Sequence, residues 1–167
     1  MVQSSTHLTL AKELNDNAVH LLFSANRWEL EQEIRNKLQR GTNGTIDRYA
    51  NSGVAFSASK PSLSLDWCKQ PDIGLPIPDL VCFLDVSEEV AMKRADFGGE
   101  RYELTDIQRR VSENYAMLGD PTWVTVSSDG TIEEVETEVF NIVIKELTKS
   151  DKGRIEKLWL DSAEEEH

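Results

Sequence analysis

The segment that most constrains the fold is residues 79–86, DLVCFLDV, an almost entirely apolar run that is followed by a serine. A run this short and this apolar predicts a strand buried on both faces, which is typical of a parallel sheet. We expect two further strands, over residues 122–126 and, shorter, over residues 45–49. The spacing of apolar and capping residues predicts helices over residues 7–14, 18–40, 62–69 and 132–147, one that begins after Ser87, and one that begins at Thr105 or Asp106 and reaches Leu118.

This order of elements predicts an α/β fold with a parallel sheet, because strands alternate with helices along the chain. Gly41 is expected to end the helix over residues 18–40. Residues 50–78 are expected to be irregular apart from the helix over residues 62–69. A chain of 167 residues fits a single domain.

The charge balance narrows the classes of partner. With 18 basic and 30 acidic residues the formal net charge is −12, which argues against a nucleic-acid surface or an anionic-membrane surface. This net charge is still compatible with a small anionic ligand that a few arginines bind. No apolar run approaches the roughly 20 residues of a membrane span, and residues 1–6 do not resemble a signal peptide. Cys68 and Cys82 have no CxxC spacing, so we expect reduced thiols in an intracellular protein.

The tripeptide Asp47-Arg48-Tyr49 follows the predicted short strand. Ligands of open α/β sheets collect at the carboxyl ends of strands. There an aspartate can hold the water shell of Mg²⁺ or accept a proton, and an arginine can bind a phosphate through two parallel hydrogen bonds. The alternative is a surface ion pair that ends a strand.

Phe23 and Arg27 are four residues apart on one predicted helix and therefore share a face. An aromatic ring beside a guanidinium can hold a flat base, by stacking and by hydrogen bonds to its carbonyl edge. The alternative places Phe23 and Trp28 in the core and leaves Arg27 solvated at the surface.

A third group of candidate residues lies in residues 93–103, where Lys93, Arg94 and Arg101 flank the pair Gly98-Gly99. Glycine-hinged loops that carry arginines to a polyphosphate recur in phosphoryl transfer. The alternative is an exposed loop of balanced charge. Tyr115 and Trp123 are expected to pack, and the histidines have no expected role in catalysis or metal binding. Glu133, Glu134, Glu136 and Glu138 are expected to form a solvated helix face.

Four stretches, residues 20–29 (HLLFSANRWE), 47–57 (DRYANSGVAFS), 63–86 and 98–103 (GGERYE), together resemble thymidylate kinase of the eukaryotic kind. The resemblance covers about residues 10–159. It implies a thymidylate kinase-like domain over residues 1–160, followed by a disordered acidic tail over residues 161–167. The implied fold is that of the P-loop nucleoside monophosphate kinases, a parallel sheet with flanking helices. The implied activity transfers the γ-phosphoryl group of ATP to dTMP, giving dTDP, with Mg²⁺.

The resemblance also implies roles for single residues. Phe23 would stack on thymine and Arg27 would bind its carbonyl edge. Asp47 would organise Mg²⁺, through water, and the phosphates, while Arg48 would hold the dTMP phosphate. The other implied positions are Ser52, Gly53, Phe56 and Tyr102 in the nucleoside pocket, Arg94 and Arg101 in a lid over ATP, and residues 127–131 near adenine.

One departure from the family pattern is large: the 167 residues contain no GxxxxGK[ST] sequence, the P-loop that binds the ATP phosphates. Relative to the family we expect a missing N-terminal segment that includes the strand between those predicted over residues 45–49 and 79–86. The two strands would then expose unpaired edges. We therefore expect this chain to be inactive in isolation.

The resemblance further implies a homodimer, or a mixed dimer with a full-length subunit, and a compartment that is cytoplasmic, nuclear or mitochondrial. Two alternatives remain open. The chain could be a non-catalytic homologue that binds dTMP or pairs with a full-length subunit, or it could be a deoxynucleoside kinase. A phosphate-binding Arg48 favours a monophosphate acceptor over a nucleoside.

Overall fold

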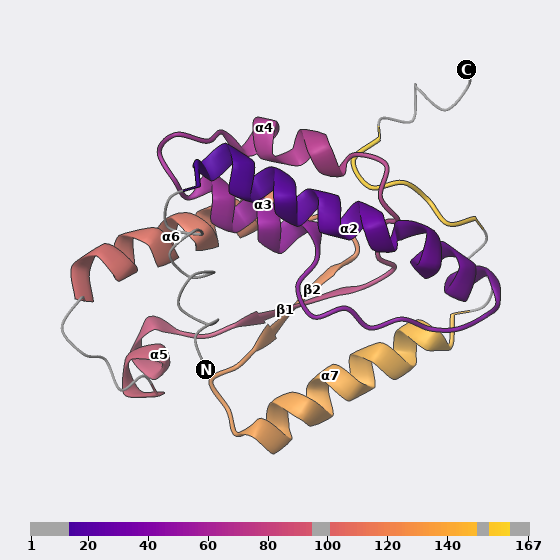
Figure 1. Cartoon of the computed structure of the whole chain (residues 1–167). Helices are drawn as coiled ribbons and strands as arrows, with labels where there is room; N and C mark the ends of the chain where they lie inside the picture. Colours follow the sequence, from indigo (N-terminus) through magenta and orange to yellow (C-terminus); the bar gives the residue numbers. More distant parts are fainter. Residues whose placement is uncertain (1–13, 95–100, 150–153, 161–167) are drawn as a thin grey trace, which may run out of the picture. The chain divides into compact units, whose positions relative to one another are not determined.

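The computed structural model describes residues 14–94, 101–149 and 154–160. The chain forms two compact units. In its described part the first unit comprises residues 14–76, 107–118 and 157–160, and the second comprises residues 77–94, 101–106, 119–149 and 154–156. Helices alternate with two parallel strands along the chain, so the predicted α/β class is confirmed (Figure 1).

The first unit is helical and is built around α2, Asp16–Gln39. The side chain of Asn15 caps this helix, and Gly41 follows its end with a φ of 78°, the conformation expected of a residue that ends a helix. Helix α2 packs on α3, Ala50–Ala58, and on the short η1, Gln70–Asp72. Helix α4, Leu65–Lys69, packs on α3, and the second part of α6, Arg101–Leu118, belongs to the same unit.

Helix α3 corrects the expectation of an irregular segment after residue 50. Its sequence, ANSGVAFSA, is poor in strong helix formers. However, Ala50, Val54 and Ala55 are completely buried on one face. Burial of this face stabilises the helix more than local preference opposes it.

The core of the first unit brings together side chains from distant segments. Its buried apolar members are Ala50, Val54, Ala55, Leu63, Cys68, Leu75, Val111, Leu118 and Leu158. Leu158 lies in the described segment 154–160, whose backbone pairs with the loop after η1: Gly74 N donates to Leu158 O, and Leu158 N donates to Leu75 O. This pairing fixes the loop that carries Asp72.

The second unit contains the sheet. Strand β1, Val81–Asp85, pairs in parallel with β2, Trp123–Ser127, so that Val81 lies opposite Trp123 and Asp85 opposite Ser127. Helix α5, Glu88–Arg94, is capped at its N-terminus by Ser87 as predicted, because Val90 N donates to Ser87 Oγ at 3.3 Å. Helix α7, Ile132–Leu147, matches its predicted bounds and begins with a reciprocal cap between Thr131 and Glu134.

Two expectations about the sheet are wrong. Strand β1 is only half-buried at Val81–Phe83 and is exposed at Leu84 and Asp85, because among the described residues it pairs with β2 alone. Residues 45–49 form no strand: no described strand pairs with them, and Ile46 is exposed. An extended segment without a hydrogen-bonding neighbour is not a strand.

Smaller differences concern the ends of elements. Helix α6 begins at Arg101, so Thr105 and Asp106 lie inside it. The helix expected over residues 62–69 begins at Leu65, where Ser64 caps it. The helix expected over residues 7–14 lies outside the described residues apart from its last residue, Leu14, and the tail over residues 161–167 lies outside them entirely.

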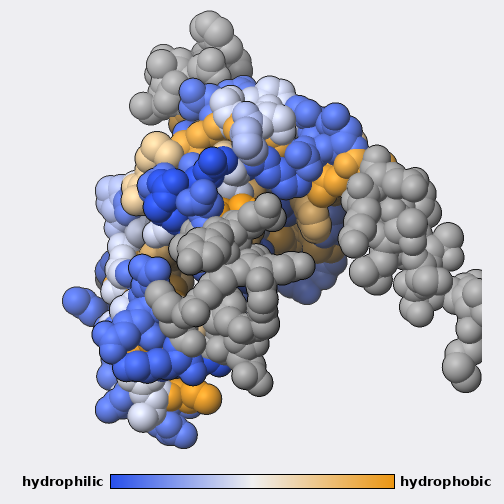
Figure 2. All heavy atoms as spheres, turned by 90° about the vertical axis from the view of Figure 1, so that its left-hand side faces the viewer, coloured by the Kyte–Doolittle hydropathy of each residue, from blue (hydrophilic) through white to orange (hydrophobic). Residues whose placement is uncertain are grey.

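Surface composition agrees with the high charge of the chain. Hydrophilic residues cover much of the face drawn in Figure 2, with smaller hydrophobic areas between them. Among the residues that the structure describes, no helix is both long enough and apolar enough to cross a bilayer.

Candidate functional site

An ion pair between Arg27 and Asp72 lies at the centre of the candidate site. Arg27 Nε donates to Asp72 Oδ1 at 3.0 Å, and Arg27 Nη2 donates to Asp72 Oδ2 at 2.5 Å. Asp72 is completely buried, and the Arg27 side chain is 13% exposed. Two parallel bonds between a guanidinium and a carboxylate fix the plane of both groups.

Helix α2 holds the Asp72 loop at further points. Ser24 Oγ lies 2.7 Å from Asp72 Oδ1 and 2.9 Å from Pro71 O, and as a hydroxyl it donates its one proton to either acceptor. Trp28 Nε1 donates to Pro71 O at 2.6 Å. Because Ser24, Arg27 and Trp28 occupy successive positions on one helix face, α2 fixes this loop over a full turn.

Gly53, on α3, lies against the Arg27 guanidinium. A Cβ atom at this glycine would lie 3.0 Å from Arg27 Nη1 and 3.1 Å from Nη2. A side chain at this position would require the guanidinium to shift by a few tenths of an ångström, so glycine suits this close approach. The structure brings together two predicted site residues that are 26 positions apart in the sequence.

Phe23 lies one turn before Arg27 on α2 and is 62% exposed. Trp28 is also exposed. The alternative that placed both rings in the core and Arg27 in solvent is therefore wrong. An exposed phenylalanine ring beside a largely buried, fixed guanidinium is available to stack on a ligand.

Arg48 is the second arginine of the first unit among the predicted site residues. Its φ of 62° is in the left-handed region, which non-glycine residues seldom occupy and which often marks functional positions. Its guanidinium carbon lies 5.4 Å from the centre of the Phe56 ring. Helix α3 begins two residues later, and Tyr49 at its N-cap makes no side-chain cap.

Tyr115 joins these residues and packs against them, as the sequence analysis expects. Its hydroxyl lies 2.8 Å from Ser52 Oγ, and its ring meets the Phe56 ring edge to face at 6.5 Å. Its spacing from Val111 and Leu118, both buried, is that of one helix face, which is why the sequence pattern indicated a packing residue.

Tyr49 connects the Asp47-Arg48-Tyr49 segment to the Arg27–Asp72 pair. Burial, followed by the charge of Asp72, raises the pKa of the Tyr49 phenol to about 12. Its hydroxyl is buried without a hydrogen-bond partner in the described part of the chain. The phenol thus stays neutral at ordinary pH.

Asp47 is exposed and is free of any ion pair with Arg48, so the alternative of a surface ion pair between these two residues finds no support in the described residues. A single free carboxylate fits Mg²⁺, which keeps most of its water ligands and takes few from protein. No group of three or more His, Cys, Asp or Glu side chains gathers as a metal site among residues 14–94, 101–149 and 154–160.

The predicted ATP-side residues belong to the second unit. Arg94, at the end of α5, donates to the backbone carbonyls of Ser128, Asp129 and Gly130 at 2.5, 3.2 and 2.6 Å. It therefore contacts the loop between β2 and α7, one of the predicted ATP-side segments. The side chains of Arg101 and Tyr102 lie outside the described part of the structure.

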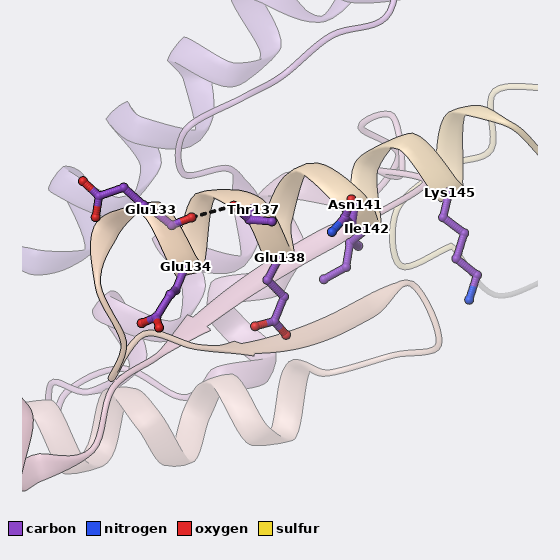
Figure 3. Close-up of a pocket in the computed structure, with 7 residues that line it drawn as sticks. All are labelled: Glu133, Glu134, Thr137, Glu138, Asn141, Ile142 and Lys145. Carbon is purple, nitrogen blue, oxygen red and sulfur yellow. Dashed lines mark hydrogen bonds between the residues drawn. The ribbon is translucent and has the colours of Figure 1, made fainter.

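A surface hollow on α7 contains none of the predicted site residues. Its lining residues all come from this one helix, and their side chains are drawn in Figure 3. They include Glu133, Glu134 and Glu138, which are exposed as the sequence predicted. A hollow along one exposed helix encloses no ligand, so we assign it no role.

Known proteins resemble this chain over most of its length. A family model described as thymidylate kinase matches residues 4–139. The chain is 42% identical to thymidylate kinase of Arabidopsis thaliana over 156 residues, which is 93% of this chain and 59% of that protein. It is 42% identical to human thymidylate kinase over 158 residues, or 93% of this chain and 74% of that protein.

A solved structure of thymidylate kinase from Candida albicans has the same fold. It superposes with a TM-score of 0.72 at 35% identity, over 87% of this chain and 74% of that chain. The fold is therefore that of the P-loop nucleoside monophosphate kinases, in which a parallel sheet is flanked by helices. From these matches in sequence and structure, the chain belongs to the thymidylate kinase family.

Proposed function

We propose that this chain carries the dTMP site of a kinase that transfers the γ-phosphoryl group of ATP to dTMP. One observation carries the proposal: Arg27 and Gly53, from different helices, are in contact, and Arg48 and Phe56 are in contact in the same unit. These four residues are the positions that the family resemblance assigns to the nucleotide acceptor.

The base would stack on the ring of Phe23 and present its carbonyl edge to the guanidinium of Arg27. The exposed Phe23 ring supplies a stacking surface, and Arg27, held by Asp72, supplies N–H donors to a carbonyl. Phe56 and Ser52, with Tyr115 behind them, would border the sugar. All of these residues belong to the first unit.

The phosphate would bind at Arg48. Among the described residues no carboxylate pairs with Arg48, so its charge is available to an anion. Helix α3 begins two residues after Arg48, and Tyr49 provides no side-chain cap for its first backbone N–H groups. Arg27, by contrast, is neutralised by Asp72 and suits an uncharged base.

Fewer of the residues expected to bind ATP, the phosphoryl donor, can be placed in the structure. Asp47 would hold Mg²⁺ through water, and the ion would supply neutralisation of phosphate charge when bound. Arg94 would order the loop Ser128–Gly130 for the nucleotide donor. We keep Arg101 as a proposed lid residue over ATP and Tyr102 as a proposed residue of the nucleoside pocket. The 167 residues contain no GxxxxGK[ST] sequence, so we propose that this polypeptide alone binds dTMP and does not transfer phosphate efficiently.

We also propose that this chain pairs with a second subunit. Helix α2 exposes Leu21, Leu22 and Leu30, which supports packing of this helix against another copy or against a longer relative. Sedimentation of the purified chain at several concentrations tests this directly. A monomer at all concentrations would contradict self-association.

The main experiment is a calorimetric titration of the 167-residue chain with dTMP, thymidine and ATP. We expect dTMP to bind most tightly, thymidine more weakly because it lacks the phosphate, and ATP more weakly than dTMP. Arg48→Ala should bring dTMP binding close to that of thymidine. Absence of dTMP binding by a folded chain would overturn the proposal.

A further inference from the structure

We propose that Asp72 is the positioning residue for base recognition: it fixes Arg27 so that the site accepts a base with a carbonyl group and rejects one with an amino group at the same position. This inference rests on the proposed function, since it assumes that Arg27 faces the base of a nucleoside monophosphate. It concerns a residue to which the family resemblance gave no role.

The hydrogen bonds of the Asp72 carboxylate support a positioning role. Its Oδ1 lies 3.0 Å from Arg27 Nε and 2.7 Å from Ser24 Oγ, and its Oδ2 lies 2.5 Å from Arg27 Nη2. The residue is completely buried, so water does not compete for these bonds. A carboxylate bound at both oxygens leaves the guanidinium one orientation.

The remaining N–H groups of Arg27 then determine what a ligand can offer. A guanidinium has five N–H donors and no acceptor. Asp72 takes the Nε donor and one Nη2 donor, which leaves both Nη1 donors and one Nη2 donor. Thymine presents the O4 carbonyl, an acceptor, whereas cytosine presents the N4 amino group, a donor. A fixed set of donors therefore matches thymine and opposes cytosine.

Gly53 also restricts movement of the Arg27 guanidinium. With a Cβ at this position only 3.0 Å from Nη1 and 3.3 Å from Cζ, the guanidinium would have to move by a few tenths of an ångström. Its two bonds to Asp72 hold it against such a movement. Arg27 is thus held between a carboxylate and a bare stretch of backbone.

The ion pair with Asp72 also gives Arg27 a different role from that of Arg48. Arg27 and Asp72 together carry no net charge, and the pair is largely buried. An anionic phosphate gains little there, whereas a neutral carbonyl still accepts a hydrogen bond. Arg48, which no described carboxylate pairs with, keeps its charge for the phosphate. Asp72 would thereby direct the base, and not the phosphate, to Arg27.

The test measures the ratio of two affinities. The 167-residue chain and its variants are titrated calorimetrically with dTMP and with dCMP on the same preparation. Because an unfolded fraction scales both signals alike, the dTMP to dCMP affinity ratio reports orientation of Arg27 and not folding. We expect the unchanged chain to prefer dTMP by about 10- to 100-fold, which corresponds to one mismatched hydrogen bond.

Asp72→Asn replaces one acceptor by an amide donor, which cannot pair with Arg27 Nη2. We expect the ratio to fall to within about threefold of one. Trp28→Phe is the matched control: it removes the bond from Trp28 Nε1 to Pro71 O in the same loop but touches neither carboxylate oxygen. It should leave the ratio unchanged even where it lowers the melting temperature.

Two further variants decide the matter if Asp72→Asn does not fold. Ser24→Ala removes one bond to Oδ1, and Gly53→Ala displaces the guanidinium while both charges remain. Each should lower the ratio. An unchanged ratio in Asp72→Asn, or in both of these variants, would overturn the role of Asp72.

The same titrations distinguish a failure of the proposed dTMP site from a failure of the proposed role of Asp72. If the folded chain does not bind dTMP, the dTMP site itself is wrong and the role of Asp72 is lost with it. If the chain binds dTMP and dCMP equally, the dTMP site stands and base selection by the Arg27–Asp72 pair is refuted.

Discussion

The guanidinium of Arg48 lies over the ring of Phe56, with 5.4 Å between its carbon and the ring centre. The two residues are at opposite ends of α3: Arg48 precedes it and Phe56 is near its last turn. The φ of 62° at Arg48 disfavours this backbone by roughly 1–2 kcal/mol for a residue with a Cβ. A strained arginine over an exposed aromatic ring is better explained by ligand binding than by stability.

Replacing Arg48 with lysine separates these two roles. Lysine keeps the charge and the same backbone strain, but it loses the planar fork that holds two phosphate oxygens. In this chain supplied with a P-loop segment ahead of it, we expect kcat/KM for dTMP to fall by about 100-fold, since a small displacement of the attacking group has effects of that size. The melting temperature should barely change. Unchanged kinetics would refute the phosphate-binding role.

Turnover by the 167-residue polypeptide itself should be negligible. The sequence has no GxxxxGK[ST] run to cradle the ATP phosphates, and phosphoryl transfer depends on positioning and charge neutralisation. Loss of a single transition-state donor already lowers a rate by roughly 10²–10³. A coupled assay of ADP release, with ATP, Mg²⁺ and dTMP, measures this. Turnover of about 1 s⁻¹, typical of kinases, would contradict the prediction.

His20 should prove structural. It is buried; Nε2 donates to Cys68 O at 2.8 Å, and Nδ1 lies 2.8 Å from Ser57 Oγ, so it joins α2, α3 and α4. His20→Ala leaves buried polar groups unpaired and should lower the free energy of unfolding by about 2 kcal/mol or more.

Two comparisons sharpen the His20 prediction. His20→Gln, which retains an N–H donor, should lose less stability than His20→Ala. The exposed Leu22→Ala on the same helix is the control and should stay within about 0.5 kcal/mol of the unchanged chain. Equal urea midpoints for His20→Ala and Leu22→Ala would contradict the structural role.

Local patterns predicted the elements that have strong periodicity. The bounds of α7 and the parallel pairing of the two strands followed from apolar spacing and short apolar runs. Helix α3 did not, because its alanines, serines and glycine carry weak local preference and its stability comes from burial against α2 and α4. The missing strand over residues 45–49 depends on a pairing partner that a local pattern cannot reveal.

Within the candidate site, too, local sequence patterns predict neighbours on one helix but not contacts between distant segments. The shared face of Phe23 and Arg27 is a property of helical spacing and could be predicted. The bonds from Arg27 to Asp72 join residues 45 positions apart, and those from Ser52 to Tyr115 join residues 63 positions apart. Such pairs arise only when the chain folds, so a local pattern could not reveal Asp72 as the partner of Arg27 or Tyr115 as the partner of Ser52.

The titration of Tyr49 provides a test in alkali. Burial and the nearby charge of Asp72 raise the pKa of this phenol to about 12, from an ordinary value of 10.0. The folded chain therefore keeps a proton that the unfolded chain has lost above pH 10. By linkage, this proton's contribution to stability is fully present below pH 10 and is lost as the pH rises toward 12.

Absorbance of tyrosinate near 295 nm, followed as the pH is raised, measures the Tyr49 transition directly. Tyr49→Phe is the matched variant, because it removes the ionisable hydroxyl and retains the ring. We expect the unchanged chain to show a late transition that Tyr49→Phe lacks, and Tyr49→Phe to lose less stability between pH 10 and 12. If Tyr49 instead titrates near 10 in the folded chain, its hydroxyl does not lie buried beside Asp72, and the link between the Asp47-Arg48-Tyr49 segment and the Arg27–Asp72 pair is wrong.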